Sequence, residues 1–384
     1  MSRVNSAPIV PNPPLLVNNT TFFCLCLTLL VYARSMVDGF GIAPRGGPNI
    51  VLLDALASEH DQPVGIITAD CSDPHEIDDG LAVEALPAEK ELYRVSAFAV
   101  DTSPLYTDED VVRQVIRQTE SRYENIGTSM EGYDPMLAQH LIRRRHFAAG
   151  QVRDALVISY LIGRDQPPTD ATLTFGKVEV LENLRYDDFG QRCSKQEQYL
   201  AFGRTAALIL HHLADGRVPD PDQAHHRIMQ ADEHTTFKRG SDINQIHMVG
   251  ANHAAAWINA DSELGIYRVH DPTDGRFAEI MSPKLARFSA TPGPHNALGL
   301  DRYMRVTSPL RRAEDFIMHG LFRARFEGRK FTGRDRKLVA AAIQKLNQHI
   351  ASAAFHGTLT LRDEDFWVPP AANAATNQGS SLLR

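Results

Sequence analysis

The sequence is poor in cysteine and carries no excess of positive charge. Its four cysteines, Cys24, Cys26, Cys71 and Cys193, have a spacing that fits neither a zinc-ligand pattern nor a disulfide framework. The net charge is -7, so the bulk charge does not indicate a nucleic acid or an anionic membrane as partner. Any contact with a polyanion must come from local basic clusters. A reducing compartment is the simpler interpretation, and we expect a cytoplasmic protein.

The sequence also lacks a long hydrophobic run and any internal repeat. The most apolar stretch, residues 22–33 (FFCLCLTLLVYA), is short beside the ~20 residues that a membrane-spanning helix needs. It has the length of a signal-peptide core, but only Arg3 precedes it as positive charge and no clear cleavage site follows. A signal or anchor, a packing segment and a translation start at Met36 remain alternatives. No stable membrane span is expected.

What is present is the patterning of a mixed α+β domain. The chain has 384 residues, 43% of them hydrophobic, which is enough for a sizeable core. Runs rich in β-forming residues predict strands at 64–69, 92–101, 154–163, 171–181 and 264–272. Helical periods predict helices at 107–123, 194–216 with Ser194 as N-cap, 243–260, 308–326 with Pro309 in its first turn, and 334–352. We expect one domain over residues 61–355, an irregular or apolar segment over 1–60, and a flexible tail over 356–384.

An acidic segment, TADCSDPHEIDDG (68–80), directly follows the first predicted strand. Packed carboxylates repel one another and raise each other's pKa unless a cation joins them. Mg²⁺ binds carboxylate oxygens together with substrate phosphate, and two such ions would stabilise the attacking and leaving oxygens of phosphodiester cleavage. A solvated acidic loop explains the segment equally well by itself. Its acidic residues are Asp70, Asp73, Glu76, Asp78 and Asp79.

A second segment, 293–319, places two arginines near the start of a predicted helix. Arg311 and Arg312 follow Ser308 and Pro309. A helix N-terminus offers free N–H groups to a phosphate, and an arginine adds a bidentate donor. The alternative is an ordinary amphipathic helix in which Arg312 and Asp315 form a surface pair one turn apart.

Together the two segments resemble the signatures of the RNB catalytic domain, found in the ribonuclease II / ribonuclease R family of exoribonucleases. The resemblance covers about residues 64–330. Between the signatures, FAVDTS (98–103), DPMLAQHL (134–141), GANHAAA (250–256) and IYRVHDP (266–272) resemble further family blocks in the same order. The first signature is carried by Asp70, Glu76, Ile77, Asp78 and Asp79, and the last by Gly293, His295, Leu298, Gly299, Leu300, Tyr303, Thr307, Ser308, Pro309, Leu310, Arg311, Arg312, Asp315 and His319.

The resemblance implies a curved mixed β-sheet surrounded by helices and a hydrolytic 3′-to-5′ exoribonuclease. Such an enzyme acts on single-stranded RNA and releases nucleoside 5′-monophosphates. It also implies Mg²⁺, as two ions that Mn²⁺ could replace. Carried over by position, Asp70, Glu76, Asp78 and Asp79 would bind metal, and Asp78 and Arg311 would be catalytic. Contacts to RNA would come from Ser308, Arg311, Arg312, Tyr303 and His295, the last two more as structural support.

The sequence departs from the family pattern at three points. Glu76 replaces an aspartate, which moves the carboxylate one methylene further out. Gln245 and Ile246 stand where the family usually has a pair of glutamates. The flanks are too short for the family's OB-fold domains, so a protein partner could replace them. The replaced carboxylates at 76 and 245–246 favour an alternative, a weak or inactive RNA-binding protein with the same fold. An unrelated Mg²⁺ phosphohydrolase would require the block matches to be coincidence.

Two basic clusters partly offset the acidic net charge. They are IRRRH (142–146) and FRARFEGRKFTGRDRK (322–337), the second with Phe322, Phe326 and Phe331 interleaved. Such clusters can guide an RNA backbone. A solvated helix surface with its aromatic residues in the core is an equally good interpretation.

Overall fold

The computed structural model describes residues 63–71, 74–86, 91–123, 133–213, 220–229, 236–270, 286–296 and 298–356. The predicted N-terminal segment, 1–60, and almost all of the predicted tail lie outside these residues. No described helix combines the length and apolar character that crossing a bilayer requires. The apolar run at 22–33 lies outside the described residues.

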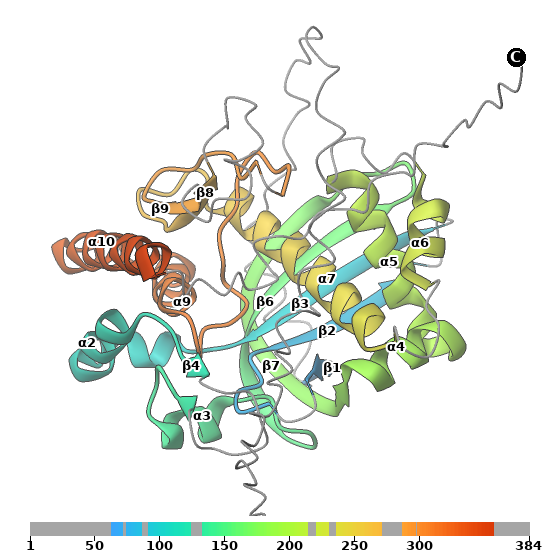
Figure 1. Ribbon diagram of the computed structural model, residues 1–384, viewed down its shortest axis with the longest axis horizontal. Helices are drawn as coiled ribbons and strands as arrows, with labels where there is room; N and C mark the ends of the chain where they lie inside the picture. The colour runs from blue at the N-terminus through green and yellow to red at the C-terminus, as the bar shows by residue number, and fades with distance from the viewer. Residues whose placement is uncertain are drawn as a thin grey trace, which may run out of the picture. The chain divides into compact units, whose positions relative to one another are not determined.

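The described residues fold as a mixed α+β domain around a sheet that closes on itself (Figure 1). Its strands are β1 (Val64–Asp70), β2 (Asp79–Ala85), β3 (Leu92–Val100), β6 (Val152–Gly163) and β7 (Thr169–Arg185), hydrogen-bonded in that order. β7 pairs in parallel with β1, and the other pairs are antiparallel. The strands predicted at 64–69, 92–101, 154–163 and 171–181 are therefore confirmed. β2 was not predicted from the sequence, because its first residue belongs to the acidic segment.

Two groups of helices surround the sheet (Figure 1). The first group comprises α4 (Tyr186–Lys195), α5 (Glu197–Leu213), α6 (Pro221–Met229) and α7 (Thr236–Ile258), and α7 packs against β1, β3, β6 and β7. The second comprises η2 (Ser103–Thr107), α2 (Glu109–Gln118), α9 (Ala313–Phe326) and α10 (Gly333–His356), which contact one another. Short elements complete the fold: β4 (Arg122–Tyr123), β5 (Tyr133–Asp134), α3 (Gln139–Arg145), β8 (Tyr267–His270) and β9 (Ala286–Ser289).

Two predicted helices begin at the wrong residue. The single helix expected at 194–216 is two helices, because Gln196 is extended (φ -110°, ψ 124°) between α4 and α5. Ser194 is thus no N-cap, and its hydroxyl donates to the Gln191 carbonyl. The helix expected from Ser308 begins only at Ala313, since Arg312 is also extended (φ -133°, ψ 128°). Pro309 therefore lies before the helix rather than in its first turn.

The helix predicted at 107–123 is shorter than expected for a local reason. α2 begins at Glu109, directly after Asp108, whose carboxylate caps the helix by accepting from the backbone N–H groups of Asp110 and Val111. It ends at Gln118 because Thr119 has a positive φ of 67°, a value that a helix cannot continue. The residues after it, 119–121, run antiparallel to 311–313 through a bridge between Glu120 and Arg312. This pairing holds Ser121 against the backbone of Arg311.

Candidate active site

The acidic segment is held at the ends of β1 and β2. Asp70 is the last residue of β1 and Asp79 the first of β2, so the hairpin brings both ends together. Two backbone hydrogen bonds fix the connection between them: Phe147 N donates to the Ile77 carbonyl, and Val100 N to that of Asp78. Asp73 lies outside the described residues. These bonds anchor the described residues 74–80 of the segment to the folded core.

Asp78 is buried, with 3% of its surface exposed, and it faces the arginine segment. Its Oδ1 accepts from the backbone N–H of Leu310 at 2.7 Å, and its Oδ2 lies 3.3 Å from Nε of Arg311. Among the described residues Oδ2 has no hydrogen-bond donor. Burial raises the pKa of Asp78 well above its usual value; Arg311 opposes this, and the charge of Glu76 adds to it. A nearby cation would stabilise the ionised form of such a buried carboxylate.

Asp70 and Asp79 lie beside a tyrosine that the sequence reading missed. Burial raises the pKa of Asp70 to about 6, while its own hydrogen bond from Cys71 N at 2.9 Å and the charge of Arg311 oppose the shift. Burial, and then the charges of Asp70 and Asp79, also raise the pKa of Tyr186. Tyr186 follows Arg185, which pairs with Asp70 across the β1–β7 ladder. The position of Tyr186 beside these carboxylates follows from the register between β1 and β7, which the sequence does not reveal.

Glu76 is buried and held by two hydroxyl groups. Its Oε1 accepts from Ser121 Oγ at 2.7 Å and from Tyr133 OH at 2.6 Å. The ring of Tyr133 stacks on His75 with centroids 4.4 Å apart. The sequence reading assigned no role to Ser121 or Tyr133, which lie far from Glu76 in the chain. These two donors thus hold the carboxylate of Glu76 at the position to which its longer side chain brings it.

The arginine segment presents one arginine to the acidic residues and buries the other. Arg311 donates to Ser308 Oγ at 2.8 Å and lies against Asp78. Arg312 is 2% exposed and pairs with Asp315 at 2.7 Å. This is the pair expected on a surface helix, but it is fully buried and lies at the start of α9. The predicted contact of Arg312 with RNA remains untested, and the geometry gives its guanidinium an internal role.

His295 and Tyr303 lie in the core, and the contact with RNA predicted for them remains untested. Their rings pack edge to face with centroids 5.3 Å apart, and both are at most 1% exposed. Asn252 of α7 donates to Tyr303 OH at 3.2 Å and accepts from Val306 N at 2.9 Å. These contacts tie α7 to the segment that leads to Ser308.

α7 carries two neighbouring amide side chains, of which Asn244 contacts an acidic residue. Asn244 is 6% exposed and donates to Asp79 Oδ1 at 3.5 Å, and its own Oδ1 has no partner among the described residues. Gln245 has a buried Nε2 that is likewise without a described partner. Ile246 belongs to the hydrophobic core. The positions expected to carry glutamates therefore supply no carboxylate, and Asn244 is a neighbour of the site that sequence reasoning did not find.

The aspartate carboxylates of the site fit a hard cation by chemistry more than by geometry. Asp70, Asp78 and Asp79 are oxygen donors whose mutual repulsion a divalent ion would relieve, and Asp78 Oδ2 is a buried acceptor without a hydrogen-bond donor among the described residues. Across the described part of the chain, however, no three carboxylate, histidine or cysteine side chains stand close enough together to hold a metal ion. The carboxylates have the right chemistry to bind Mg²⁺, but they would have to move closer together to do so.

The two basic clusters differ in their structural role. In the second cluster, Arg323 pairs with Asp101, Arg334 with Glu109 and Arg336 with Glu263. Its three phenylalanines are buried or pack against the core. The solvated-surface interpretation is therefore favoured for 322–337. In the first cluster, Arg143 and Arg144 are exposed on α3, and among the described ion pairs neither takes part.

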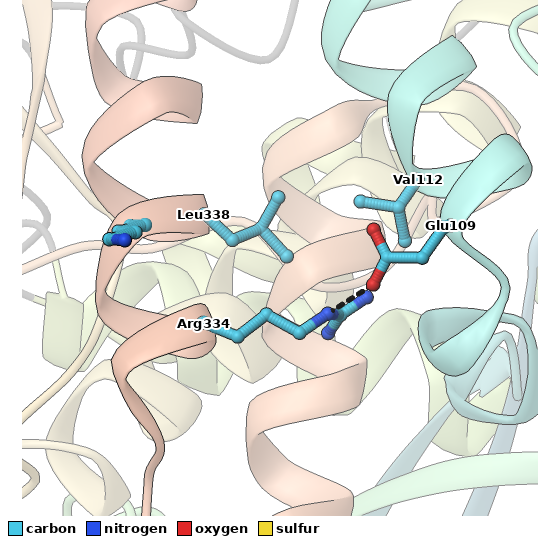
Figure 2. Close-up of a pocket in the computed structure, with 5 residues that line it drawn as sticks. Glu109, Val112, Arg334 and Leu338 are labelled. Carbon is cyan, nitrogen blue, oxygen red and sulfur yellow. Dashed lines mark hydrogen bonds and ion pairs between the residues drawn. The ribbon is translucent and has the colours of Figure 1, made fainter.

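A surface pocket lies between α2 and α10, as Figure 2 shows. Glu109, Val112, Arg334, Lys337 and Leu338 line it, and Arg334 forms an ion pair with Glu109 across it. None of the predicted site residues contributes to the pocket.

Comparison with known proteins shows the class to which this fold belongs. The chain has the fold of the RNB exoribonuclease family, the ribonuclease II / R type. It superposes on an active-site mutant of the Dss1 exoribonuclease from Candida glabrata with a TM-score of 0.60 and 17% identity, over 78% of this chain and 45% of that one. It superposes equally well (TM-score 0.60, 15% identity) on Mycoplasma genitalium RNase R in complex with ribose-methylated single-stranded RNA, over 80% and 60% of the two chains.

Two further comparisons limit the functional conclusions that this similarity supports. Exoribonuclease 2 of Edwardsiella piscicida is 28% identical over 125 residues, which are 30% of this chain and 19% of that protein. Yeast Ssd1, described as a pseudonuclease, matches with a TM-score of 0.56 and 14% identity, over 80% and 46% of the chains. No protein-family model matches the sequence. The chain thus spans about a fifth of the curated relative and about half of the structural relatives, which include both nucleases and a pseudonuclease.

Proposed function

We propose that the protein is a Mg²⁺-dependent 3′-to-5′ exoribonuclease that hydrolyses single-stranded RNA to nucleoside 5′-monophosphates. The observation that carries the proposal is the pairing of Asp78 with the arginine segment. A buried carboxylate, one of whose oxygens lacks a donor among the described residues, lies 3.3 Å from a guanidinium that is itself oriented by Ser308. This arrangement places carboxylate oxygens that could bind a metal next to an arginine that could bind a phosphate.

Each residue has a chemical task in this proposal. Asp70, Asp78 and Asp79 would hold the metal, with Glu76 beside them. Bound Mg²⁺ supplies positive charge that offsets the charge of the scissile phosphate. Arg311 donates to the same phosphate and stabilises the charge that builds up in the transition state. Leu310 N and Ser308 Oγ keep Asp78 and Arg311 in register with each other.

The proposal predicts that Asp78→Asn abolishes cleavage and leaves RNA binding largely intact. The amide is almost isosteric with the carboxylate but cannot serve as an anionic ligand. The measurement is the shortening of a 5′-labelled single-stranded RNA with Mg²⁺ or with chelator, together with a binding assay. Asp110→Asn on the surface of α2 is the matched control, because Asp110 is exposed. Degradation by Asp78→Asn at the parent rate would show that the site is misplaced.

A second candidate function is an RNA-binding protein with little or no catalysis. It is favoured by the absence of a three-ligand cluster among the described residues, by Gln245 in place of a carboxylate and by the likeness to a pseudonuclease. The same RNA experiment separates the two. A metal-dependent ladder that shortens from the 3′ end supports the enzyme, whereas a shifted RNA band without shortening supports the binding protein.

A further inference from the structure

The contacts of Ser121 point to a link between the two halves of the proposed active site. Its hydroxyl accepts from Met136 N at 2.9 Å and donates to Glu76 Oε1 at 2.7 Å. A serine hydroxyl has a single proton, so with Met136 as donor that proton goes to the glutamate. The backbone N–H of Ser121 donates to the Arg311 carbonyl at 3.0 Å. One fully buried residue therefore touches both the acidic segment and the arginine segment.

The backbone around Ser121 makes this link rigid. Ala313 N donates to the Thr119 carbonyl at 2.8 Å, and Glu120 bridges to Arg312. Residues 119–121 thus pair with 311–313 like a short antiparallel ribbon. Thr119 keeps a positive φ of 67° to enter this pairing, a conformation that a threonine adopts only when its surroundings enforce it. Arg311 cannot shift against Ser121 without breaking these bonds.

The length of Glu76 explains why such a link is needed. A glutamate has one more rotatable bond than an aspartate, so fixing its carboxylate costs more conformational entropy. Ser121 and Tyr133 remove that freedom by donating to the same oxygen. Tyr133 is itself held by stacking on His75. The carboxylate is therefore placed by its partners and not by its own backbone.

We infer that Ser121 is a positioning residue that orients Glu76 and fixes its distance from Arg311, with Tyr133 as its partner on Glu76. The inference deepens the proposed function and rests on it. Partners that orient metal-binding side chains typically contribute about 10–100-fold to metal affinity or activity. Ser121→Ala and Tyr133→Phe are each expected to lower kcat about tenfold with little change in KM, and to weaken Mg²⁺ binding similarly.

The decisive experiment is a double-mutant cycle of Ser121→Ala with Glu76→Ala, which removes the acceptor oxygen of Ser121. Two quantities are measured: kcat on a single-stranded RNA, and the affinity for Mg²⁺ alone by calorimetry. If Ser121 acts through Glu76, its replacement has no further effect once residue 76 has no oxygen to accept its hydrogen bond. Tyr133→Phe repeats the test with the aromatic ring retained. Ser159→Ala is the control, because that buried hydroxyl bonds Ser96 within the sheet; circular dichroism shows that each variant is folded.

The outcomes separate the inference from the proposed function. Non-additive losses in both quantities support the inference. Parent-like values in folded Ser121→Ala, or losses that add in the cycle, overturn it and leave the exoribonuclease proposal standing. A parent protein that binds Mg²⁺ with the same non-additive pattern but does not cleave RNA supports the positioning role and overturns the proposed cleavage. A parent that neither cleaves RNA nor binds Mg²⁺ overturns both.

Discussion

Single residues in the proposed site are set by the groups that donate to them and by how deeply they are buried. Asp78 receives a backbone donor on one oxygen and a guanidinium near the other, whereas Glu76 receives two hydroxyl donors on one oxygen. Both carboxylates are buried, yet their surroundings differ in charge. Asp78 faces the cation that would also hold a phosphate, and Glu76 is oriented by neutral groups. The two carboxylates should therefore respond differently to substitution.

Glu76→Asp is expected to slow the reaction, although it restores the residue usual in the family. The shorter side chain cannot reach both Ser121 and Tyr133, and each hydrogen bond removed from a buried group costs ~1–3 kcal/mol. The free energy of unfolding from urea titration and kcat on RNA should both fall. Glu263→Asp on the surface serves as the control, because Glu263 is exposed. A higher kcat in Glu76→Asp would contradict the fit of the hydroxyl pair to glutamate.

The raised pKa of Asp70 predicts how the stability of the metal-free protein depends on pH. Because the folded pKa, about 6, exceeds the ordinary 3.8, the native state binds this proton more tightly than the unfolded chain. In chelator, the free energy of unfolding should therefore fall as pH rises from about 4 to 6 and then level off. Asp78 acts in the same direction. Asp70→Asn should flatten the profile, and a parent profile that rises over this range would refute the assignment.

Mg²⁺ should reverse that dependence if the carboxylates bind it. Metal ligation requires the ionised form, so protons and Mg²⁺ compete for the same oxygens. Stabilisation by Mg²⁺ is thus expected to grow as pH rises through about 6.

At the scale of elements, the start of α9 depends on a buried ion pair. Arg312 and Asp315 are at most 2% exposed, and Asp315 Oδ1 also accepts from Ser308 N at 2.8 Å. The pair therefore fixes both the helix start and the segment that carries Arg311.

Arg312→Ala is expected to lower the free energy of unfolding by ~3–5 kcal/mol, because it leaves a buried carboxylate without its partner. Arg113→Ala removes an exposed pair of the same spacing, with Asp110, and should cost under ~1 kcal/mol. Urea unfolding of both variants makes the comparison. Equal and small losses would show that Arg312 is available for RNA after all.

At the scale of the whole molecule, the acidic chain offers RNA a limited basic surface. The arginines of 322–337 are largely engaged in internal pairs, whereas Arg143 and Arg144 are exposed on α3. α3 adjoins the acidic segment, since Phe147 just after it bonds the Ile77 carbonyl. If RNA is the substrate, these two arginines are well placed to meet its backbone.

Replacing Arg143 and Arg144 together with alanine should weaken RNA binding and make it less sensitive to salt. For each phosphate of a single strand that the protein no longer neutralises, the slope of log K against log salt concentration falls by ~0.7, so a decrease of about 1.4 is expected. Arg329 and Arg336, paired with Glu327 and Glu263, provide the double-alanine control. An unchanged slope in the Arg143/Arg144 variant would remove α3 from the RNA path.

The sequence by itself determined the mixed α+β class, most strands of the sheet and the family whose fold the chain shares. Strand patterning and ordered motifs are local features, so they can be recognised in the sequence without a structure. It also singled out Asp70, Glu76, Asp78, Asp79 and Arg311. Tertiary structure alone decided what surrounds them: Ser121, Tyr133, Tyr186 and Asn244 meet the carboxylates only through sheet register and chain pairing. It also decided which arginine is buried, because burial depends on contacts between segments far apart in the chain.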